Sequence, residues 1–350
     1  MVRTAFPEID LDGTPYEMGL QHGRENRRAI ERALAIRLGL VCQTLPLTPG
    51  ECFRLSKEYA DLYARLCPST AEEVEGLARG AGLDLDEAWF LQTWEEVGHV
   101  ERAACCCVAA GGEATREGGL LVGMNLDAPP WTSEEMVLVR RTPKSGPRSL
   151  QLSCYGELGS CGINAEGMAV FNLALAGARA RGGAPARLLC RMALEAESAA
   201  GWLAAFEKTP PAATCNLLVA DAKDGRIINV ECAGGAHEVT YNGSGLYVHA
   251  NTPHAPAFQK PQAEDQEDPS RVREVRMLLL ADQYRGGVTV EILQAILSDH
   301  QNYPQYSICR HSAGPNRLST LASFVAEPNE GALNVCLGPP CEGGAERREL

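Results

Sequence analysis

Three adjacent cysteines, Cys105–Cys107, are the residues in this sequence best suited to chemistry. They lie where helical sequence patterns give way to short apolar segments typical of strands. In an extended segment, Cys105 and Cys107 face one side and Cys106 the other, so the three thiols cannot easily share one tetrahedral metal ion. A buried strand of small side chains is the ordinary interpretation. The functional interpretation is a thiol nucleophile at the start of a strand.

A polar residue pair ends the next apolar segment. Gly118 and Gly119 predict a turn, and the following apolar run ends in Asn125-Leu126-Asp127. A hairpin of this kind returns Asp127 close to the start of the first strand. If the chain were cut before Cys105, this carboxylate would lie beside the new N-terminal amine and hold it in place.

Composition limits the function classes. The chain has 350 residues, 45% of them hydrophobic, which is enough for a sizeable packed core. The net charge of −13 disfavours nucleic acid and anionic membranes as general partners. Residues 1–9 lack the pattern of a secretory signal, and no apolar run approaches the ~18 residues of a membrane span. We therefore expect a cytoplasmic protein that does not enter the membrane.

The 14 cysteines are expected to be reduced and mostly buried, because no secretory signal is evident. Zinc sites usually combine two closely spaced pairs of ligands. Cys336 and Cys341 approach that pattern, but no second pair of the same kind accompanies them. The sequence therefore predicts no metal and no other cofactor.

The chain divides near residue 104. Residues 1–104 are predicted to be helical after an opening stretch, because apolar residues recur at helical spacing. Ser69-x-x-Glu72 and Asp84-x-x-Glu87 are capping-box patterns that predict two helix starts. The first of these helices is expected to end near Gly80 or Gly82.

Residues 105–350 are predicted to combine short strands with a few helices. Strands are expected at 107–110, 120–124, 136–140, 149–154, 168–175, 216–220, 227–231 and 245–249. Helices are expected at 186–196, 271–284 and 290–297, with a surface loop at 260–269. Runs of strands with grouped helices indicate an α+β fold of antiparallel sheets covered by helices. Several strands are apolar on both faces, which favours two sheets that face each other.

Seven motifs occur in an order and spacing that resemble a known family, the acyl-coenzyme A:6-aminopenicillanic acid acyltransferases within the N-terminal-nucleophile hydrolases. Each motif alone is weak, but together they extend over nearly the whole chain. They comprise Gly13, Gly19 and Gly23; Cys105–Cys107; Gly123, Asn125 and Asp127; Gly162, Asn164 and Gly167; His249 and Asn251; Asp299 and His300; and Ser307 and Arg310.

The resemblance implies a four-layer αββα sandwich of two antiparallel sheets, with a helical N-terminal segment. It also implies self-cleavage between Ala104 and Cys105. Residues 1–104 and 105–350 would then form one compact unit, with the αββα catalytic part in the longer fragment. The freed α-amine of Cys105 would take the proton of its own thiol, which attacks the substrate to form a thioester acyl-enzyme.

The resemblance assigns roles to three further residues. Asp127 would orient the amine of Cys105, and its ordinary alternative is a cap at the end of a strand. Asn251 would donate its side-chain N–H to the oxyanion of the tetrahedral intermediate, and its alternative is a turn residue. Arg310 would bind an acid group or order the pocket around Cys105, and its alternative is a structural ion pair.

Other residues are further candidates for these roles. Cys106 is the next candidate for the nucleophile, and His22, His300 and His311 are expected to be mainly structural. The family usually has glycine before the nucleophile and hydroxyl residues after it, whereas this chain has Ala104 before it and cysteines after it. An alanine is tolerated least well there if the backbone needs a positive φ.

The expected activity is that of an amidohydrolase or N-acyltransferase acting on a small N-acylated amine or peptide-like amide. The sequence leaves open whether an acyl thioester is the acyl donor and whether the protein forms a homo-oligomer. One alternative is a hydrolase that works without cleavage, using Cys309 or Cys105 with His311. The other is a thiol-rich binding or metal-storing protein, with Cys105–Cys107 as soft ligands.

Overall fold

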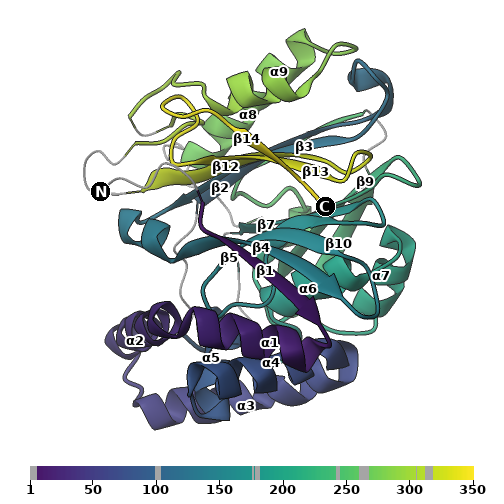
Figure 1. Cartoon of the computed structure of the whole chain (residues 1–350). Helices are drawn as coiled ribbons and strands as arrows, with labels where there is room; N and C mark the ends of the chain where they lie inside the picture. Colours follow the sequence, from purple (N-terminus) through teal and green to yellow (C-terminus); the bar gives the residue numbers. More distant parts are fainter. Residues whose placement is uncertain are drawn as a thin grey trace.

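The computed structural model of the chain describes residues 6–98, 104–175, 177, 182–241, 245–259, 268–304, 306–311 and 318–350. Two β-sheets pack face to face, and helices cover the outer face of each sheet (Figure 1). The predicted α+β sandwich with four layers is therefore confirmed. Apolar side chains fill the space between the sheets and the space beneath each helical layer.

The larger sheet has eight strands in the order β1-β4-β5-β6-β7-β8-β9-β10. Neighbouring strands are antiparallel except for β1, which runs parallel to β4. The strands are β1 Glu8–Gly13, β4 Met136–Pro143, β5 Ser149–Cys154, β6 Cys161–Asn164, β7 Met168–Ala174, β8 Cys215–Asp221, β9 Arg226–Ala233 and β10 Ala236–Tyr241.

The smaller sheet has six antiparallel strands in the order β11-β2-β3-β12-β13-β14. They are β2 Ala104–Ala110, β3 Leu121–Ala128, β11 Leu246–His249, β12 Ser319–Glu327, β13 Ala332–Leu337 and β14 Glu346–Glu349. The hairpin of β2 and β3 places Ala104 opposite Asp127 and Cys105 opposite Leu126. This is the return of Asp127 toward the start of β2 that the sequence predicts.

Among the described residues, seven helices lie on the outer side of the larger sheet and two on the outer side of the smaller one (Figure 1). The first group is α1 Pro15–Glu25, α2 Arg27–Thr44, α3 Pro49–Leu66, α4 Pro68–Ala81, α5 Leu85–Gly98, α6 Ala186–Glu195 and α7 Ala199–Phe206. The second group is α8 Pro269–Gln283 and α9 Val290–Leu297. Short 3-10 turns lie at Gly112–Ala114, Pro130–Glu135 and Pro256–Phe258. In the part of the chain that the structure describes, no helix has the length and apolar character to cross a bilayer.

The capping box predicted at Ser69 is wrong. Helix α4 begins one residue earlier, at Pro68, because proline is well suited to the first helical position. Ser69 therefore lies within the first turn, and its hydroxyl donates to Glu195 Oε2 over 2.6 Å. The predicted end of this helix is confirmed, since Gly82 takes a left-handed conformation with φ of 70°.

At Asp84, one of the two predicted capping hydrogen bonds is present: its N–H donates to Glu87 Oε2 over 2.8 Å. Complete capping boxes occur instead at Thr14 with Glu17 and at Thr48 with Glu51. Neither pair was predicted from the sequence.

Other corrections concern elements that sequence analysis missed. Residues 8–13, in the opening stretch before the predicted helices, form β1, with buried Ile9 and Leu11 alternating with exposed residues. The strands β6, β10, β12, β13 and β14 and the helix α7 were also not predicted. The predicted surface loop at 260–269 lies mostly outside the described residues, but Pro269 opens α8 and Asp268 caps it.

Candidate active site

Cys105 is the second residue of β2, and its buried side chain lines a cavity of about 200 Å³. Leu126, Ala128 and Leu152 add apolar surface next to it. The wall that lies toward the N-terminal helices is charged. The thiol thus faces a small space that is apolar on one side and polar on the other.

Cys106 points away from this cavity, as the strand alternation predicts. Its thiol lies 3.9 Å from the carbonyl oxygen of Ile308, in the apolar layer beneath α8 and α9. Burial raises the pKa of Cys106 to about 12. Burial, followed by the nearby Asp127 carboxylate, raises the pKa of Cys105 well above its usual range. In the uncleaved chain, Cys105 is therefore held as a neutral thiol that faces the cavity.

Asp127 is fully buried, and its two carboxylate oxygens have different surroundings. Oδ1 accepts a hydrogen bond from Thr320 Oγ1 at 2.7 Å. Oδ2 lies 3.5 Å from Arg273 Nη1 and 3.8 Å from Arg310 Nε, and among the described residues it has no hydrogen-bond partner. Burial raises the pKa of Asp127 to about 6, although the two guanidinium groups oppose the shift. Oδ2 can therefore accept a hydrogen bond from an amine at the start of β2.

Arg310 lies beside this carboxylate. Its backbone N–H donates to Thr320 Oγ1 over 2.9 Å, and Thr320 in turn donates to Asp127. Burial and the neighbouring Arg273 lower the pKa of Arg310. Two adjacent cations therefore face the single Asp127 carboxylate.

Arg273, which was not predicted from the sequence, connects most of the candidate site. Its buried guanidinium donates to the carbonyl oxygen of Cys105 over 3.2 Å and to Asn251 Oδ1 over 2.9 Å. On α8 it shares a buried face with Met277 and Ala281, at a spacing of four residues. A charged residue on the apolar face of a predicted helix is a signal that could have revealed it.

Asn251 follows β11 and lies in a fixed orientation. Arg273 occupies Oδ1, so the amide nitrogen Nδ2 is the donor, and it bonds the carbonyl oxygen of Ala174 at 2.7 Å. Ala174 lines the cavity, whereas Asn251 itself is not part of the cavity wall. Glu231 anchors the surrounding loop through His249 Nε2, at 2.7 Å, and the N–H of Ala255, at 2.8 Å.

Asn172 of β7 is another residue that sequence analysis missed. It lines the cavity together with Cys105, and its Oδ1 has no hydrogen-bond partner among the described residues. A polar residue in the otherwise apolar run 168–175 was the available signal. Its carboxamide is a second candidate donor to a developing oxyanion.

Ala104 suits its position because it begins β2 in an extended strand. Among the described residues, Asn302 is the one non-glycine residue with a positive φ. The backbone at Ala104 therefore does not require glycine. Residues 99–103, which lead to the expected cleavage site, lie outside the described residues.

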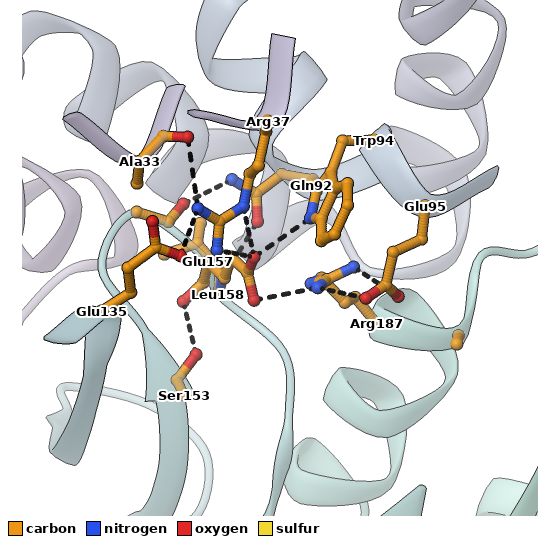
Figure 2. A network of polar contacts seen from close by, with 12 residues as sticks. Ala33, Arg37, Gln92, Trp94, Glu95, Glu135, Ser153, Glu157, Leu158 and Arg187 are labelled. Atoms are coloured by element: carbon orange, nitrogen blue, oxygen red, sulfur yellow. Dashed lines mark hydrogen bonds and ion pairs between the residues drawn. The ribbon is translucent and has the colours of Figure 1, made fainter. Parts of the chain in front are cut away.

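Figure 2 shows a buried ion network on the charged wall of the cavity. Arg37 contacts Glu135 at 2.9 Å and Glu157 at 2.6 Å, and Trp94 donates to Glu157 over 3.1 Å. Arg187 also contacts Glu157, at 2.9 Å. Although burial opposes it, these two arginines lower the pKa of Glu157. The network joins α2, α5 and α6, so no local pattern could have predicted it.

His22, for which the sequence predicts a structural role, is buried in α1 and accepts a hydrogen bond from the N–H of Gly156 at 3.2 Å. His300 and His311 lie close to Cys309 and Cys341, outside the cavity.

Comparisons with known proteins indicate the family of the chain. The sequence model of the family described as acyl-coenzyme A:6-aminopenicillanic acid acyl-transferase matches residues 114–342, more than half of the chain. A curated relative from Emericella nidulans, the acyl-coenzyme A:6-aminopenicillanic-acid-acyltransferase 40 kDa form, is 30% identical over 344 residues. That match covers 95% of this chain and 92% of the relative.

Solved structures with a similar arrangement include a mutant of conjugated bile acid hydrolase from Clostridium perfringens, with a TM-score of 0.49 and 12% identity. That match covers 70% of this chain and 97% of the hydrolase. Penicillin V acylase from Agrobacterium tumefaciens matches with a TM-score of 0.46 and 14% identity, over 66% of this chain and 82% of the acylase.

The chain belongs to the acyl-coenzyme A:6-aminopenicillanic acid acyltransferase family. Its four layers agree with the N-terminal-nucleophile hydrolase fold that the resemblance implies. The family assignment supports an enzyme of the acyltransferase or amidohydrolase class.

Proposed function

We propose that this protein is a self-cleaving amidohydrolase or N-acyltransferase whose nucleophile is Cys105 and whose substrate is a small N-acylated amine or peptide-like amide. The observation that carries the proposal is the position of Cys105, which faces the cavity, with Asp127 across the hairpin from Ala104 and its Oδ2 without a hydrogen-bond partner among the described residues. The family assignment and the name of the Emericella relative support the same chemistry.

Activation begins with an attack of the Cys105 thiol on the carbonyl carbon of Ala104. The C–N bond between the two residues breaks, an S–C thioester forms, and the thiol proton passes to the departing nitrogen. Water then hydrolyses the thioester, which leaves a carboxylate on Ala104 and a free amine and thiol on Cys105. Asp127 Oδ2 accepts a hydrogen bond from that amine and holds it beside the thiol.

Turnover uses the freed amine as the base. Its ordinary pKa is about 7.7–8.0, so part of it is neutral near pH 7 and can take the thiol proton. The thiolate attacks the acyl carbon, and carboxamide donors stabilise the oxyanion. Asn251 would donate the second N–H of its amide, and Asn172, which lines the cavity, would be a second donor. The protonated amine then passes its proton to the leaving amine.

The cavity favours a compact acyl group. Its volume of about 200 Å³ lies below the ~300–1,000 Å³ of typical ligand pockets. The acyl group would contact Leu126, Ala128 and Leu152, with a polar end toward Arg187 and Glu95. Water as acceptor would give hydrolysis, and an amine would give acyl transfer. An acyl thioester could load the same cysteine.

A second candidate function is the hydrolase that works without cleavage. One observation favours it, because Cys309 Sγ lies 3.8 Å from His311 Nε2. Neither residue lines the cavity beside Cys105, however. The first proposal therefore accounts for more of the structure.

The test is to identify the acylated cysteine. The purified protein is incubated with a panel of short-chain N-acyl amines and acyl thioesters, quenched in acid, and mapped by peptide mass spectrometry. The proposal expects the acyl group on Cys105 and no turnover by the Cys105→Ala variant. Cys106→Ala, the matched neighbour, should keep its activity. Acylation of Cys309, or an active Cys105→Ala variant, would contradict the proposal.

A further inference from the structure

Four residues outside the cavity form a compact cluster of sulfur and nitrogen atoms. His300, Cys309, His311 and Cys341 each offer one atom, and all four atoms lie within 4.8 Å of one another. The first three residues belong to the segment between α9 and β12, while Cys341 lies between β13 and β14. Cys309 is buried, His311 is half-buried, and the other two residues are exposed.

The separations agree with those of tetrahedral zinc ligands. Zinc–sulfur and zinc–nitrogen bonds of about 2.3 and 2.05 Å imply S–S, S–N and N–N separations of about 3.8, 3.6 and 3.3 Å. The Cys309 and Cys341 sulfurs lie 3.7 Å apart. His311 Nε2 lies 3.8 and 3.4 Å from these two sulfurs. The two imidazole Nε2 atoms are 2.8 Å apart, so they need to separate by about half an ångström.

The surroundings of the cluster also match those of a metal site. The other ring nitrogen of His311, Nδ1, lies 3.2 Å from a carboxylate oxygen of Glu342. Such a carboxylate fixes the histidine tautomer in which Nε2 is free to bind a metal ion. Backbone hydrogen bonds hold Cys309 in place, since its N–H donates to the oxygen of Asp299 and its carbonyl oxygen accepts from Ser307 Oγ.

We propose that His300, Cys309, His311 and Cys341 bind a structural zinc ion. Soft thiolates combined with imidazoles in a tetrahedral set favour zinc over magnesium or calcium. Binding releases two thiol protons, and the two thiolates neutralise the charge of Zn²⁺. All four ligands come from the protein, as in structural rather than catalytic zinc sites.

The zinc ion would connect the candidate active site to the last hairpin. Arg310, which faces Asp127, lies between the ligands Cys309 and His311. The metal would therefore fix the segment that carries this guanidinium. It would also occupy Nε2 of His311, so this histidine could not serve as a base for Cys309. The inference does not depend on the proposed nucleophile, because none of the four ligands lines the cavity.

The site was not predicted because its ligands are not paired in the sequence at the usual short spacings. Cys341 lies near Cys336 in the sequence, whereas the fold brings Cys341 to Cys309, 32 residues away. His300 follows the end of α9, so only the folded chain brings the four ligands together.

The experiment measures metal content and metal geometry in the full chain without a histidine tag. The protein is purified in the presence of a thiol reductant and without chelators. Elemental analysis should then find one zinc ion per chain. After removal of zinc, Co²⁺ should give the visible bands of a tetrahedral site and a thiolate charge-transfer band. Zinc should also raise the thermal unfolding temperature of the metal-free protein.

Variants separate this site from adventitious binding. Cys341→Ser changes an exposed residue and should lose the cobalt thiolate band and most of the bound zinc. Glu342→Gln should weaken zinc binding by about 10–100-fold. Cys42→Ser, a half-buried thiol on α2, is the matched control and should bind like the wild type.

Three results would overturn the proposal. The first is a fully reduced wild-type protein that takes up no zinc, and the second is equal zinc uptake by Cys341→Ser. The third is a disulfide between Cys309 and Cys341, seen as the loss of two hydrogen atoms from the mass, that persists in reductant and blocks metal binding. An active or inactive enzyme would not affect this readout.

Discussion

At the scale of single residues, the candidate site is a cluster of buried charges in which Arg273 makes the most connections. It contacts the backbone of Cys105, the amide of Asn251 and the carboxylate of Asp127. Because its contacts use the planar geometry of the guanidinium, a lysine cannot replace them. Arg273 is a positioning residue, since it acts through Cys105 and Asn251.

The Arg273→Lys variant should therefore lose kcat by about 100-fold, the loss typical when an oxyanion donor is misplaced, with little change in KM. Arg271→Lys, on the same helix with a half-exposed side chain, is the control and should behave like the wild type. Steady-state kinetics on an accepted amide measures both. An equal loss in the two variants, or a loss confined to KM, would argue against this role.

His22 gives a second prediction at this scale. Burial lowers its pKa to about 4 from the ordinary 6.5, and its neutral ring accepts the hydrogen bond from Gly156. Because the pKa of His22 is lower in the folded than in the unfolded protein, the neutral ring stabilises the folded state above pH 6.5. This stabilisation is lost as the pH falls toward 4.

Between about pH 7.5 and pH 5, the wild type should lose about 2 kcal/mol more unfolding free energy than His22→Gln, which cannot gain the proton. Urea unfolding at the two pH values measures the difference. His237→Gln on β10 is the control and should lose as much as the wild type. If His22→Gln shows the same pH dependence as the wild type, the assignment is wrong.

At the scale of elements, the spaced glycines at the start of the sequence have a packing role. Helices α1 and α4 touch backbone to backbone through Gly19 and Gly76. A Cβ atom at Gly19 would lie 2.0 Å from the carbonyl oxygen of Glu73, and one at Gly76 would lie 2.1 Å from that of Tyr16. Neither backbone can yield without moving its helix.

Gly76→Ala should therefore destabilise the protein by about 1–3 kcal/mol, although alanine is the better helix former. Gly39→Ala, in the middle of α2 with nothing within 4 Å of the added Cβ, should stabilise it by about 0.5–1 kcal/mol. Urea denaturation tests both. Stabilisation by Gly76→Ala would contradict the close backbone contact between α1 and α4.

The features that could be predicted from the sequence are those that depend on interactions between residues close together in the chain. The relation of Cys105 to Asp127 depends on one hairpin, whose turn and apolar run are adjacent in the sequence. Arg273 reaches the same place from a helix 168 residues further on, and only the packing of α8 against β2 brings it there. Similarly, β1 was missed because its short alternating pattern is stabilised by a partner, β4, more than a hundred residues away.

At the scale of the whole molecule, the helices that precede residue 104 share one apolar core with the strands of the larger sheet, and β1 is a strand of that sheet. Buried ion pairs cross the same boundary, including Arg37 with Glu135 and Arg141 with Glu73.

If the chain is cut before Cys105, the two fragments should stay together in native buffer. Size-exclusion chromatography should show one peak that contains both fragments, at the volume of an uncleaved Cys105→Ala control. Denaturant should separate them. Elution of the shorter fragment alone under native conditions would contradict the shared core.

The central claim is that Cys105 becomes the N-terminal nucleophile, and intact mass under denaturing conditions tests it most directly. The wild type should give two species, residues 1–104 and residues 105–350, while Cys105→Ala should give one full-length chain. Cys106→Ala should still be cut at the same bond. A single full-length chain in the wild type, or cleavage that persists without the Cys105 thiol, would contradict the account.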